Sequence, residues 1–348
     1  MNISVGIVGL GRVGRSVLRT NFLQKDNGRF NIKVLSDVMP ISQVAYLIEH
    51  DSTYGKPPFS VDCDNENLII SGNKIRYVQV DRRKSHQENN GLNELIDLKI
   101  DILVNATGTA QIKDLRNLID KQITKKILCS WNINGGDISL AYGVNEQQYD
   151  TNQHHIVSAS TCTGNAMAPL AYILDKHIGI DYARITTIHP ALSDQHLLDG
   201  FHKHSHLGRT TAASIIPTKT NVADSTTLIL PGLKGKLDSF SYRVPTEIVS
   251  AMDVSTTLTR ETSIEEITDL LNQYASDKFS KILHCDYGKW GHEKVSIDYI
   301  GTQFSTIVLM NHLSLINQRQ LGISIMHDNE RGYSCRALDI LGILAKSF

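Results

Sequence analysis

The chain has 348 residues, which is long enough for two domains with separate hydrophobic cores. Its 35 basic and 36 acidic residues leave a net charge of −1, which excludes a charge-driven partner such as nucleic acid or a membrane surface. The five cysteines are odd in number, widely spaced and form no C-x-x-C pair, which argues against a disulfide framework or a cysteine zinc site. No apolar run reaches membrane-spanning length, and the N-terminus lacks the basic segment of a signal peptide. We therefore expect a reduced, cytoplasmic protein.

Strand and helix patterns alternate through the first third of the chain. This alternation predicts a Rossmann-type α/β fold with a doubly wound parallel sheet. The predicted strands are 3–8, 31–36, 102–105 and 126–130, and the predicted helices are 12–23 and 113–121.

A glycine motif, G-L-G-R-V-G, lies between the first predicted strand and helix, with Gly9, Gly11 and Gly14 in G-x-G-x-x-G spacing. These glycines permit a tight turn, close backbone approach to a pyrophosphate, and close packing of the helix on the strand. The helix N-terminus, at Arg12 and Val13, then faces the phosphates. The motif predicts dinucleotide binding.

Asp37 follows the second predicted strand. A carboxylate there can bond the adenosine ribose hydroxyls and repels a 2′-phosphate, which favours NAD over NADP. The alternative is a solvated aspartate at a strand end.

The stretch S-A-S-T-C-T-G-N-A-M-A-P, at residues 158–169, places Cys162 between a polar turn and an apolar helical period. Cys162 is thus expected at a helix N-terminus, where backbone N–H groups favour the thiolate. The alternative is a buried structural cysteine. A cysteine nucleophile needs a base, and His189, which ends R-I-T-T-I-H, is the best candidate.

Beyond Cys162 the predicted strands are longer and rich in Thr, Val and Ile. They cover 184–188, 243–254 and 304–310, and predicted helices cover 263–274, which opens with a capping box, and 332–345. This texture predicts a second domain of the α+β class with a mixed or antiparallel sheet. We expect an NAD-binding domain at 1–161, a catalytic domain at 162–331, and a C-terminal helix at about 332–348 that packs back on the first domain.

Three histidines, His202, His204 and His206, alternate in F-H-K-H-S-H-L-G. In an extended segment they would share one face and could bind zinc or copper. The alternative, a solvated loop, is the one we favour, so no metal is expected.

Several motifs, in order, resemble the phosphorylating glyceraldehyde-3-phosphate dehydrogenase family. The Cys162 segment is similar to that family's S-N-A-S-C-T-T-N-C-x-A-P. T-T-I-H-P-A-L-S-D-Q is similar to T-T-V-H-A-Y-T-A-T-Q, and still more to the T-T-I-H-S-A-M-H-D-Q of erythrose-4-phosphate dehydrogenases. S-I-I-P-T-K-T, G-K-L-D-S-F-S-Y-R-V-P-T and H-D-N-E-R-G-Y-S complete a resemblance that covers essentially the whole chain.

The resemblance implies that NAD oxidises a phosphorylated aldehyde, with inorganic phosphate as second substrate. Cys162 would form a thiohemiacetal and then a thioester, which phosphate cleaves to an acyl phosphate, and His189 would take the proton as hydride leaves. The implied cofactor contacts are Thr107, Gly108, Asn329, which would hold the nicotinamide carboxamide, and Tyr333. The implied phosphate contacts are Thr161, Thr163, Thr220, Asn221 and, for the substrate's own phosphate, Arg243. A homotetramer is implied as well.

Some positions depart from the family pattern. Leu192 replaces a threonine that holds the substrate phosphate, and Gly164 replaces a threonine of C-T-T-N. The others are Val8 for asparagine, Asn221 for glycine, His327 for tyrosine and Arg331 for tryptophan. The reaction centre is retained while the substrate-phosphate contacts are reduced, so the substrate's identity stays open. Erythrose 4-phosphate is one alternative, and a catalytically inactive NAD-binding or interaction protein is another. The sequence does not reveal the pathway or its direction.

Overall fold

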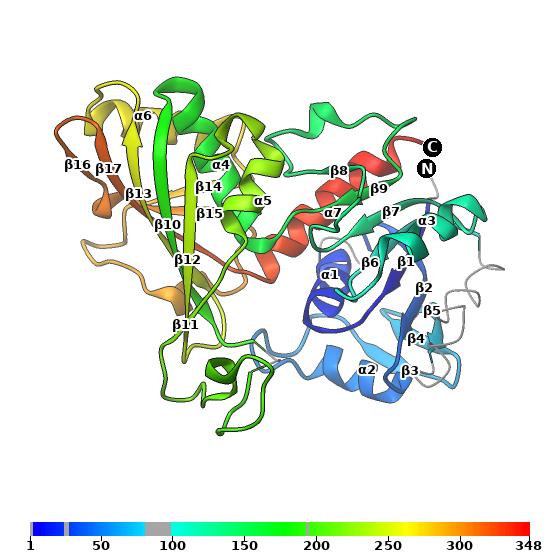
Figure 1. The fold of residues 1–348 in the computed structure, drawn as a ribbon. Helices are drawn as coiled ribbons and strands as arrows, with labels where there is room; N and C mark the ends of the chain where they lie inside the picture. Colours follow the sequence, from blue (N-terminus) through cyan, green and yellow to red (C-terminus); the bar gives the residue numbers. More distant parts are fainter. Residues whose placement is uncertain (1–2, 24–27, 81–98, 193–194) are drawn as a thin grey trace. The chain divides into compact units, whose positions relative to one another are not determined.

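The computed structural model describes residues 3–23, 28–80, 99–192 and 195–348. The chain divides into two compact units, each built around its own sheet (Figure 1). The first unit comprises Met1–Tyr142, Glu146–Ser160 and Ser334–Phe348, and the second comprises Gly143–Asn145 and Thr161–Tyr333. None of the helices in the described part of the chain combines the length and apolarity that crossing a membrane requires.

The first unit contains a nine-stranded sheet in the order β3-β4-β5-β2-β1-β6-β7-β9-β8. Its strands are β1 (Ser4–Val8), β2 (Asn31–Asp37), β3 (Val61–Cys63), β4 (Asn67–Ile70), β5 (Asn73–Gln79), β6 (Ile100–Asn105), β7 (Thr124–Cys129), β8 (Ile138–Ser139) and β9 (Ile156–Ser158). The run from β5 to β8 is parallel, and β3 and β4 add an antiparallel edge. The central strand β1 is buried along its whole length, as apolar strands of a parallel sheet are. This topology confirms the predicted Rossmann-type fold.

Three helices accompany this sheet: α1 (Arg12–Leu23), α2 (Ile41–Glu49) and α3 (Ile112–Asp120). Helix α1 has the predicted bounds. Helix α2 and the edge strands β3 to β5 were not predicted. Strand β3 has only three residues and none of them is fully buried. So short a segment is too brief to show the alternation of apolar and polar residues from which a strand is predicted.

The second unit contains an eight-stranded mixed sheet in the order β11-β12-β10-β13-β17-β15-β14, with β16 paired to β17. Its strands are β10 (Ile180–Pro190), β11 (Ile216–Thr218), β12 (Leu237–Val244), β13 (Ser250–Leu258), β14 (Leu283–Asp286), β15 (Thr306–Leu309), β16 (Ser314–Ile316) and β17 (Gln320–His327). Strand β10 runs parallel to β12 and antiparallel to β13, which confirms the predicted mixed sheet.

The helices of the second unit are α4 (Cys162–His177), α5 (Val222–Ile229) and α6 (Ile264–Ser276). Helices α4 and α5 contact each other, and α4 contacts β10 and β15 while α5 contacts β12 (Figure 1). The hydroxyl of Ser263 accepts the Glu266 amide at 3.1 Å, so the predicted start of α6 is correct. A final helix, α7 (Arg331–Ala345), begins in the second unit and continues in the first.

The prediction of one strand over 243–254 is wrong. Strand β12 ends at Val244 and β13 begins at Ser250, and β10 lies between them in the sheet. Pro245 has no N–H for a ladder bond, and Val249 has φ 69°, a left-handed conformation that a β-branched residue rarely adopts. The chain therefore turns between two strands that are not neighbours.

Candidate active site

The glycine loop of the first unit connects β1 to α1. Gly9 has φ +87°, and a Cβ there would lie 2.7 Å from the Thr107 amide nitrogen. A Cβ on Gly14 would lie 1.9 Å from the Gly9 carbonyl oxygen, whereas one on Gly11 would meet nothing within 4 Å. Two glycines thus serve close backbone packing, and the third leaves open space that a ligand can approach.

That open space belongs to a pocket of about 860 Å³ in the first unit. The pocket lies at the carboxyl ends of β1, β2 and β6, the edge where doubly wound sheets bind nucleotides. Its lining includes Gly9, Gly11, Asp37, Asn105 and Thr107. The N-terminus of α1, at Arg12 and Val13, has backbone amides without an intrahelical acceptor, which suit a phosphate.

Asp37 ends β2 and lines this pocket, as predicted. Its carboxylate accepts the Leu10 amide of the glycine loop at 2.5 Å and the Met39 amide at 3.0 Å. The aspartate therefore orders the glycine loop as well as presenting negative charge to the pocket.

The turn after β6 forms another wall of the pocket. The Thr107 amide and hydroxyl both donate to the side-chain oxygen of Asn105, at 3.1 and 2.8 Å, and Gly108 follows with φ +68°. The Arg12 side chain is directed elsewhere, because its guanidinium contacts Asp51 at 3.3 Å. Only the backbone of Arg12 is then suited to a phosphate.

Cys162 is the first residue of α4, as its sequence context predicts. The Thr161 hydroxyl caps the helix by accepting the Gly164 amide at 3.0 Å. It also lies 3.3 Å from the Thr163 hydroxyl and donates to Ser225 of α5 at 3.1 Å. Thr161 therefore joins the N-terminal turn of α4 to α5, and no sequence motif points to Ser225.

Two opposing effects act on the pKa of the Cys162 thiol. Burial raises the pKa of the Cys162 thiol, and although the backbone amide of Thr163 and the charge of Arg243 lower it, they do not offset the burial. The carboxylate of Glu330 raises it further. The backbone amides at the start of α4 therefore act against burial, in the direction that favours the thiolate.

His189 and Arg243 are brought together by strand register. They are directly paired across β10 and β12. His189 is buried and Arg243 is half-buried, whereas the preceding residues on the two strands, Ile188 and Tyr242, are 40% and 38% exposed. Arg243 also influences Cys162 electrostatically, so its charge faces both members of the predicted catalytic pair.

The hydrogen bond of His189 fixes its tautomer. Nδ1 lies 2.8 Å from the Pro190 carbonyl oxygen, so Nδ1 carries the proton and Nε2 keeps the lone pair. Burial, assisted by the charge of Arg243, lowers the pKa of His189 to about 4. A neutral imidazole of this kind can accept a proton. Within the described residues no hydrogen bond joins His189 to Cys162.

The remaining predicted contacts lie in the second unit. Thr220 and Asn221 precede α5, whose N-cap is Asn221, and Tyr333 is in the first turn of α7. Asn329 lies in the turn between β17 and α7, and its buried side-chain oxygen has no hydrogen-bond partner within the described part of the chain. Leu192 is 41% exposed beyond the end of β10.

One buried residue has no role in the sequence-based site. His327 ends β17 opposite Ser250 of β13, and neither imidazole nitrogen has a hydrogen-bond partner among the residues that the structure describes. Burial, together with the neighbouring His189, lowers the pKa of His327 to about 3, so its ring is neutral. Only the departure from the family's tyrosine marked this position in the sequence.

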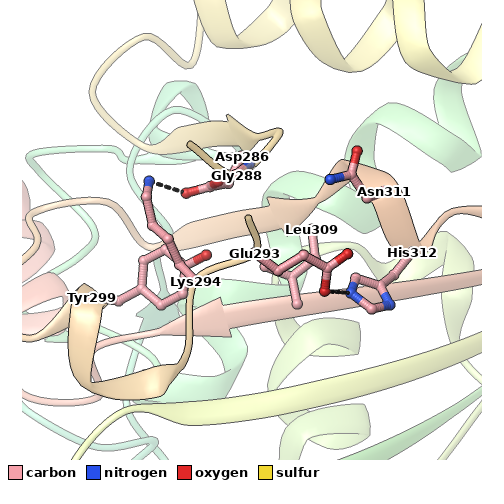
Figure 2. A pocket seen from close by; sticks show the side chains of 8 residues that line it. All are labelled: Asp286, Gly288, Glu293, Lys294, Tyr299, Leu309, Asn311 and His312. Carbon is pink, nitrogen blue, oxygen red and sulfur yellow. Dashed lines mark hydrogen bonds and ion pairs between the residues drawn. The ribbon is translucent and has the colours of Figure 1, made fainter. Parts of the chain in front are cut away.

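Two other features were considered as sites. The ring centroids of His202 and His204 are 5.8 Å apart, and those of His204 and His206 are 6.3 Å apart. Across the described ranges no group of three or more His, Cys, Asp or Glu is placed to hold a metal ion. A hollow of about 10 Å³ has room for a single water. Its lining side chains, drawn in Figure 2, include the ion pairs of Lys294 with Asp286 and of His312 with Glu293. It is too small for a substrate.

Comparison with known proteins gives this geometry a family. The glyceraldehyde 3-phosphate dehydrogenase NAD-binding domain matches residues 3–113, and the C-terminal domain of the same enzymes matches residues 161–329. The chain belongs to the glyceraldehyde 3-phosphate dehydrogenase family.

Full-length relatives agree with this assignment. The chain is 32% identical to glyceraldehyde-3-phosphate dehydrogenase of Geobacillus stearothermophilus over 346 residues, 99% of each chain. It is 33% identical to glyceraldehyde-3-phosphate dehydrogenase 1 of Bacillus subtilis over 99% of each, and 34% identical to the Kitasatospora aureofaciens enzyme over 98% of each. As a member of this glyceraldehyde 3-phosphate dehydrogenase family, the chain is an NAD-dependent dehydrogenase, and the pocket at the glycine loop fits NAD.

Proposed function

We propose that the protein oxidises a phosphorylated aldehyde, glyceraldehyde 3-phosphate or a close analogue, to an acyl phosphate through a thioester on Cys162. The observation that carries this proposal is the pairing of a neutral His189 with Arg243 on adjacent strands, with the charge of Arg243 also reaching Cys162 at the start of α4. Nucleophile, base and charge are three of the parts that acyl transfer needs.

In this mechanism the Cys162 sulfur attacks the aldehyde carbon, its proton passes to His189 Nε2, and His189 returns that proton to the carbonyl oxygen, which gives the thiohemiacetal hydroxyl. The backbone amides of Cys162 and Thr163 at the start of α4 favour negative charge on the sulfur during this attack. His189 Nε2 takes the hydroxyl proton as the carbon loses its hydride, and bound NAD supplies the hydride acceptor. Inorganic phosphate then attacks the thioester carbon, which releases the acyl phosphate and the Cys162 sulfur.

We assign NAD binding to Gly9, Gly11, Asp37, Thr107 and Gly108, with the amides of Arg12 and Val13 at the pyrophosphate and Gly14 packing the helix. Asn329 and Tyr333 are assigned to the nicotinamide end. The buried, unpartnered oxygen of Asn329 supports this assignment, because a carboxamide donor would satisfy it. Accordingly, residues 1–161 form the NAD-binding domain with the C-terminal helix, and 162–331 the catalytic domain.

The attacking phosphate is assigned to Thr161, Thr163, Thr220 and Asn221. Support comes from the contact between α4 and α5, which brings two helix N-termini into one region. Because the Thr161 hydroxyl already caps α4, we expect Thr163 and Thr220 to contribute the stronger hydroxyl contacts. Arg243 is assigned to the substrate's own phosphate.

Leu192 carries the proposal about substrate choice. A leucine gives no hydrogen bond to a phosphoryl oxygen, and loss of one bond to a charged group costs about 1.5–3 kcal/mol, or roughly 10–150-fold in affinity. We therefore expect a high KM for glyceraldehyde 3-phosphate and better relative use of a longer aldehyde such as erythrose 4-phosphate. Leu192→Thr should lower the KM for glyceraldehyde 3-phosphate. A micromolar KM in the wild type, without turnover of erythrose 4-phosphate, would contradict this expectation.

A single-turnover burst tests the central proposal. Enzyme with NAD and an excess of aldehyde, without phosphate, should release about one NADH per active site, and adding phosphate should restore steady turnover. Cys162→Ser should remove the burst while NAD still binds, and Cys285→Ser, on β14, is the matched control. An NAD-binding protein without catalysis would give no burst with any aldehyde of a panel.

We also propose a homotetramer in the cytoplasm. The outer sheet face of the second unit exposes Tyr182, Ile188 and Tyr242, and Leu198 and Phe201 are 78% and 94% exposed in the following loop. Exposed apolar patches of this kind indicate protein–protein contact. Sedimentation equilibrium of wild type and of Tyr242→Glu tests the assembly, and a monomeric wild type would contradict it.

A further inference from the structure

Asp328 is a buried carboxylate that the proposed chemistry leaves without a task. It is 1% exposed and lies directly after β17, one residue before Asn329. Burial of a carboxylate is costly unless hydrogen bonds compensate for the lost water. The groups that Asp328 binds therefore indicate what it is there to hold.

The two carboxylate oxygens bind different segments of the second unit. Oδ1 accepts the backbone amides of Glu330 and Arg331, at 3.0 and 2.8 Å, and so closes a turn around Asn329. Oδ2 accepts the amide of Gly301 at 2.8 Å, a residue 27 positions earlier in the chain. The turn that carries Asn329 is thus anchored both to the start of α7 and to the segment near Gly301.

The Asn329 side chain itself offers no such anchor. Its oxygen is buried and has no hydrogen-bond partner among the described residues. Its direction is consequently set by the backbone turn on which it is mounted, and Asp328 holds both ends of that turn.

We propose that Asp328 is a positioning residue for Asn329 and thereby determines which face of the nicotinamide ring receives the hydride. This inference rests on the proposed role of Asn329 in holding the nicotinamide carboxamide. If the turn loosens, the carboxamide is no longer fixed in one orientation, and the ring can present either face to the substrate.

Two substitutions separate this role from general structural support. Asp328→Asn keeps one side-chain oxygen for the turn but turns an N–H₂ group toward the Gly301 N–H, so that donor faces donor. Asp328→Ser keeps a capping oxygen and loses the link to Gly301. The matched control is Asp64→Asn, since Asp64 accepts the amides two and three residues later, at 2.9 and 2.7 Å, in the β3–β4 turn of the first unit.

The experiment uses glyceraldehyde 3-phosphate deuterated at its aldehyde carbon and reads, by NMR, which C4 position of the reduced cofactor carries deuterium. Wild type and Asp64→Asn should give a single diastereomer. Asp328→Asn and Asp328→Ser should give a mixture, with a KM for NAD raised roughly tenfold, as for one lost bond to a charged group. Asn329→Ala should give a mixture as well.

Folded Asp328→Asn and Asp328→Ser enzymes that give a single diastereomer would overturn the inference, and Asp328→Ser alone decides it if Asp328→Asn does not fold. If Asn329→Ala gives a mixture of deuterated diastereomers while the Asp328 variants give one, only the role of Asp328 is contradicted. A single product from Asn329→Ala defeats the proposed role of Asn329 itself.

Discussion

The two candidate sites of this protein are built in different ways. In the first unit, the cofactor loop is formed by backbone. Three glycines within six residues shape the turn, and the Asp37 carboxylate holds it by accepting the Leu10 amide. In the second unit, the reacting groups are side chains that come from separate elements, with Cys162 at a helix start and His189 and Arg243 on paired strands. A local motif specifies the first kind of site, whereas strand register specifies the second.

The largest expected effect tests the side-chain site. His189→Asn should retain slow acylation of Cys162 but lose about 10²–10⁴-fold in rate, because no base takes the proton. Since the pKa of His189 is lowered to about 4, the imidazole loses its proton-accepting form only as pH falls toward that value. Single-turnover rates over a pH series should therefore fall near pH 4 in the wild type. An acid limb near pH 6.5, or an unchanged rate in His189→Asn, would show that another group is the base.

The next prediction tests the backbone site by comparing two glycines of one motif. Gly14→Ala forces a Cβ to within 1.9 Å of the Gly9 carbonyl oxygen, so we expect a loss of about 3–5 kcal/mol in the free energy of unfolding and loss of NAD binding. Gly11→Ala meets nothing within 4 Å and should fold as the wild type does, yet bind NAD more weakly. Urea unfolding and NAD titration measure the two quantities. Equal free energies of unfolding for the two variants would contradict the assignment of Gly14 to backbone packing and Gly11 to ligand access.

A smaller effect is expected at Asp37, where the backbone loop depends on one side chain. Asp37→Ala should narrow the preference for NAD over NADP by roughly 10–150-fold, the equivalent of one hydrogen bond to a charged group. Because the carboxylate also accepts the Leu10 amide, Asp37→Asn is the control that keeps an acceptor for the loop while removing the charge. Fluorescence titration with both cofactors gives the ratio, and equal wild-type affinities would mean that Asp37 does not face the 2′ position.

The smallest expected effect concerns the buried His327. Its folded-state pKa is lowered to about 3, so below pH 6.5 the unfolded chain binds more protons than the folded one, and stability is lost as pH falls from 6.5 toward 3. At pH 5 this group accounts for a loss of about 2 kcal/mol relative to pH 7. His327→Tyr should reduce the difference in unfolding free energy between the two pH values by that amount, and His206→Gln, on an exposed loop, should not. Identical pH dependence in wild type and His327→Tyr would contradict it.

Much of the fold follows from local patterns. The apolar runs at β1, β2, β6 and β7 and the helix over Arg12–Leu23 were predicted within a few residues, because buried parallel strands and amphipathic helices have strong periodic signals. The failure at 243–254 has a different cause: β-branched residues surround Pro245, whose missing N–H is the one local sign of a break, and the left-handed Val249 and the sheet order show that two strands are involved.

The sequence by itself determined the turn chemistry of the glycine loop, the helix start at Cys162 and the candidate base, because each depends on residues close together in the chain. Only the tertiary structure decided how these groups behave. Three features join residues that lie far apart in the sequence. They are the pairing of His189 with Arg243, the position of the His327 ring opposite Ser250, and the hydrogen bond from the Gly301 amide to Asp328. Burial opposes the effect of the helix N-terminus on the pKa of Cys162, and the sequence does not reveal this burial because desolvation depends on everything packed around the thiol.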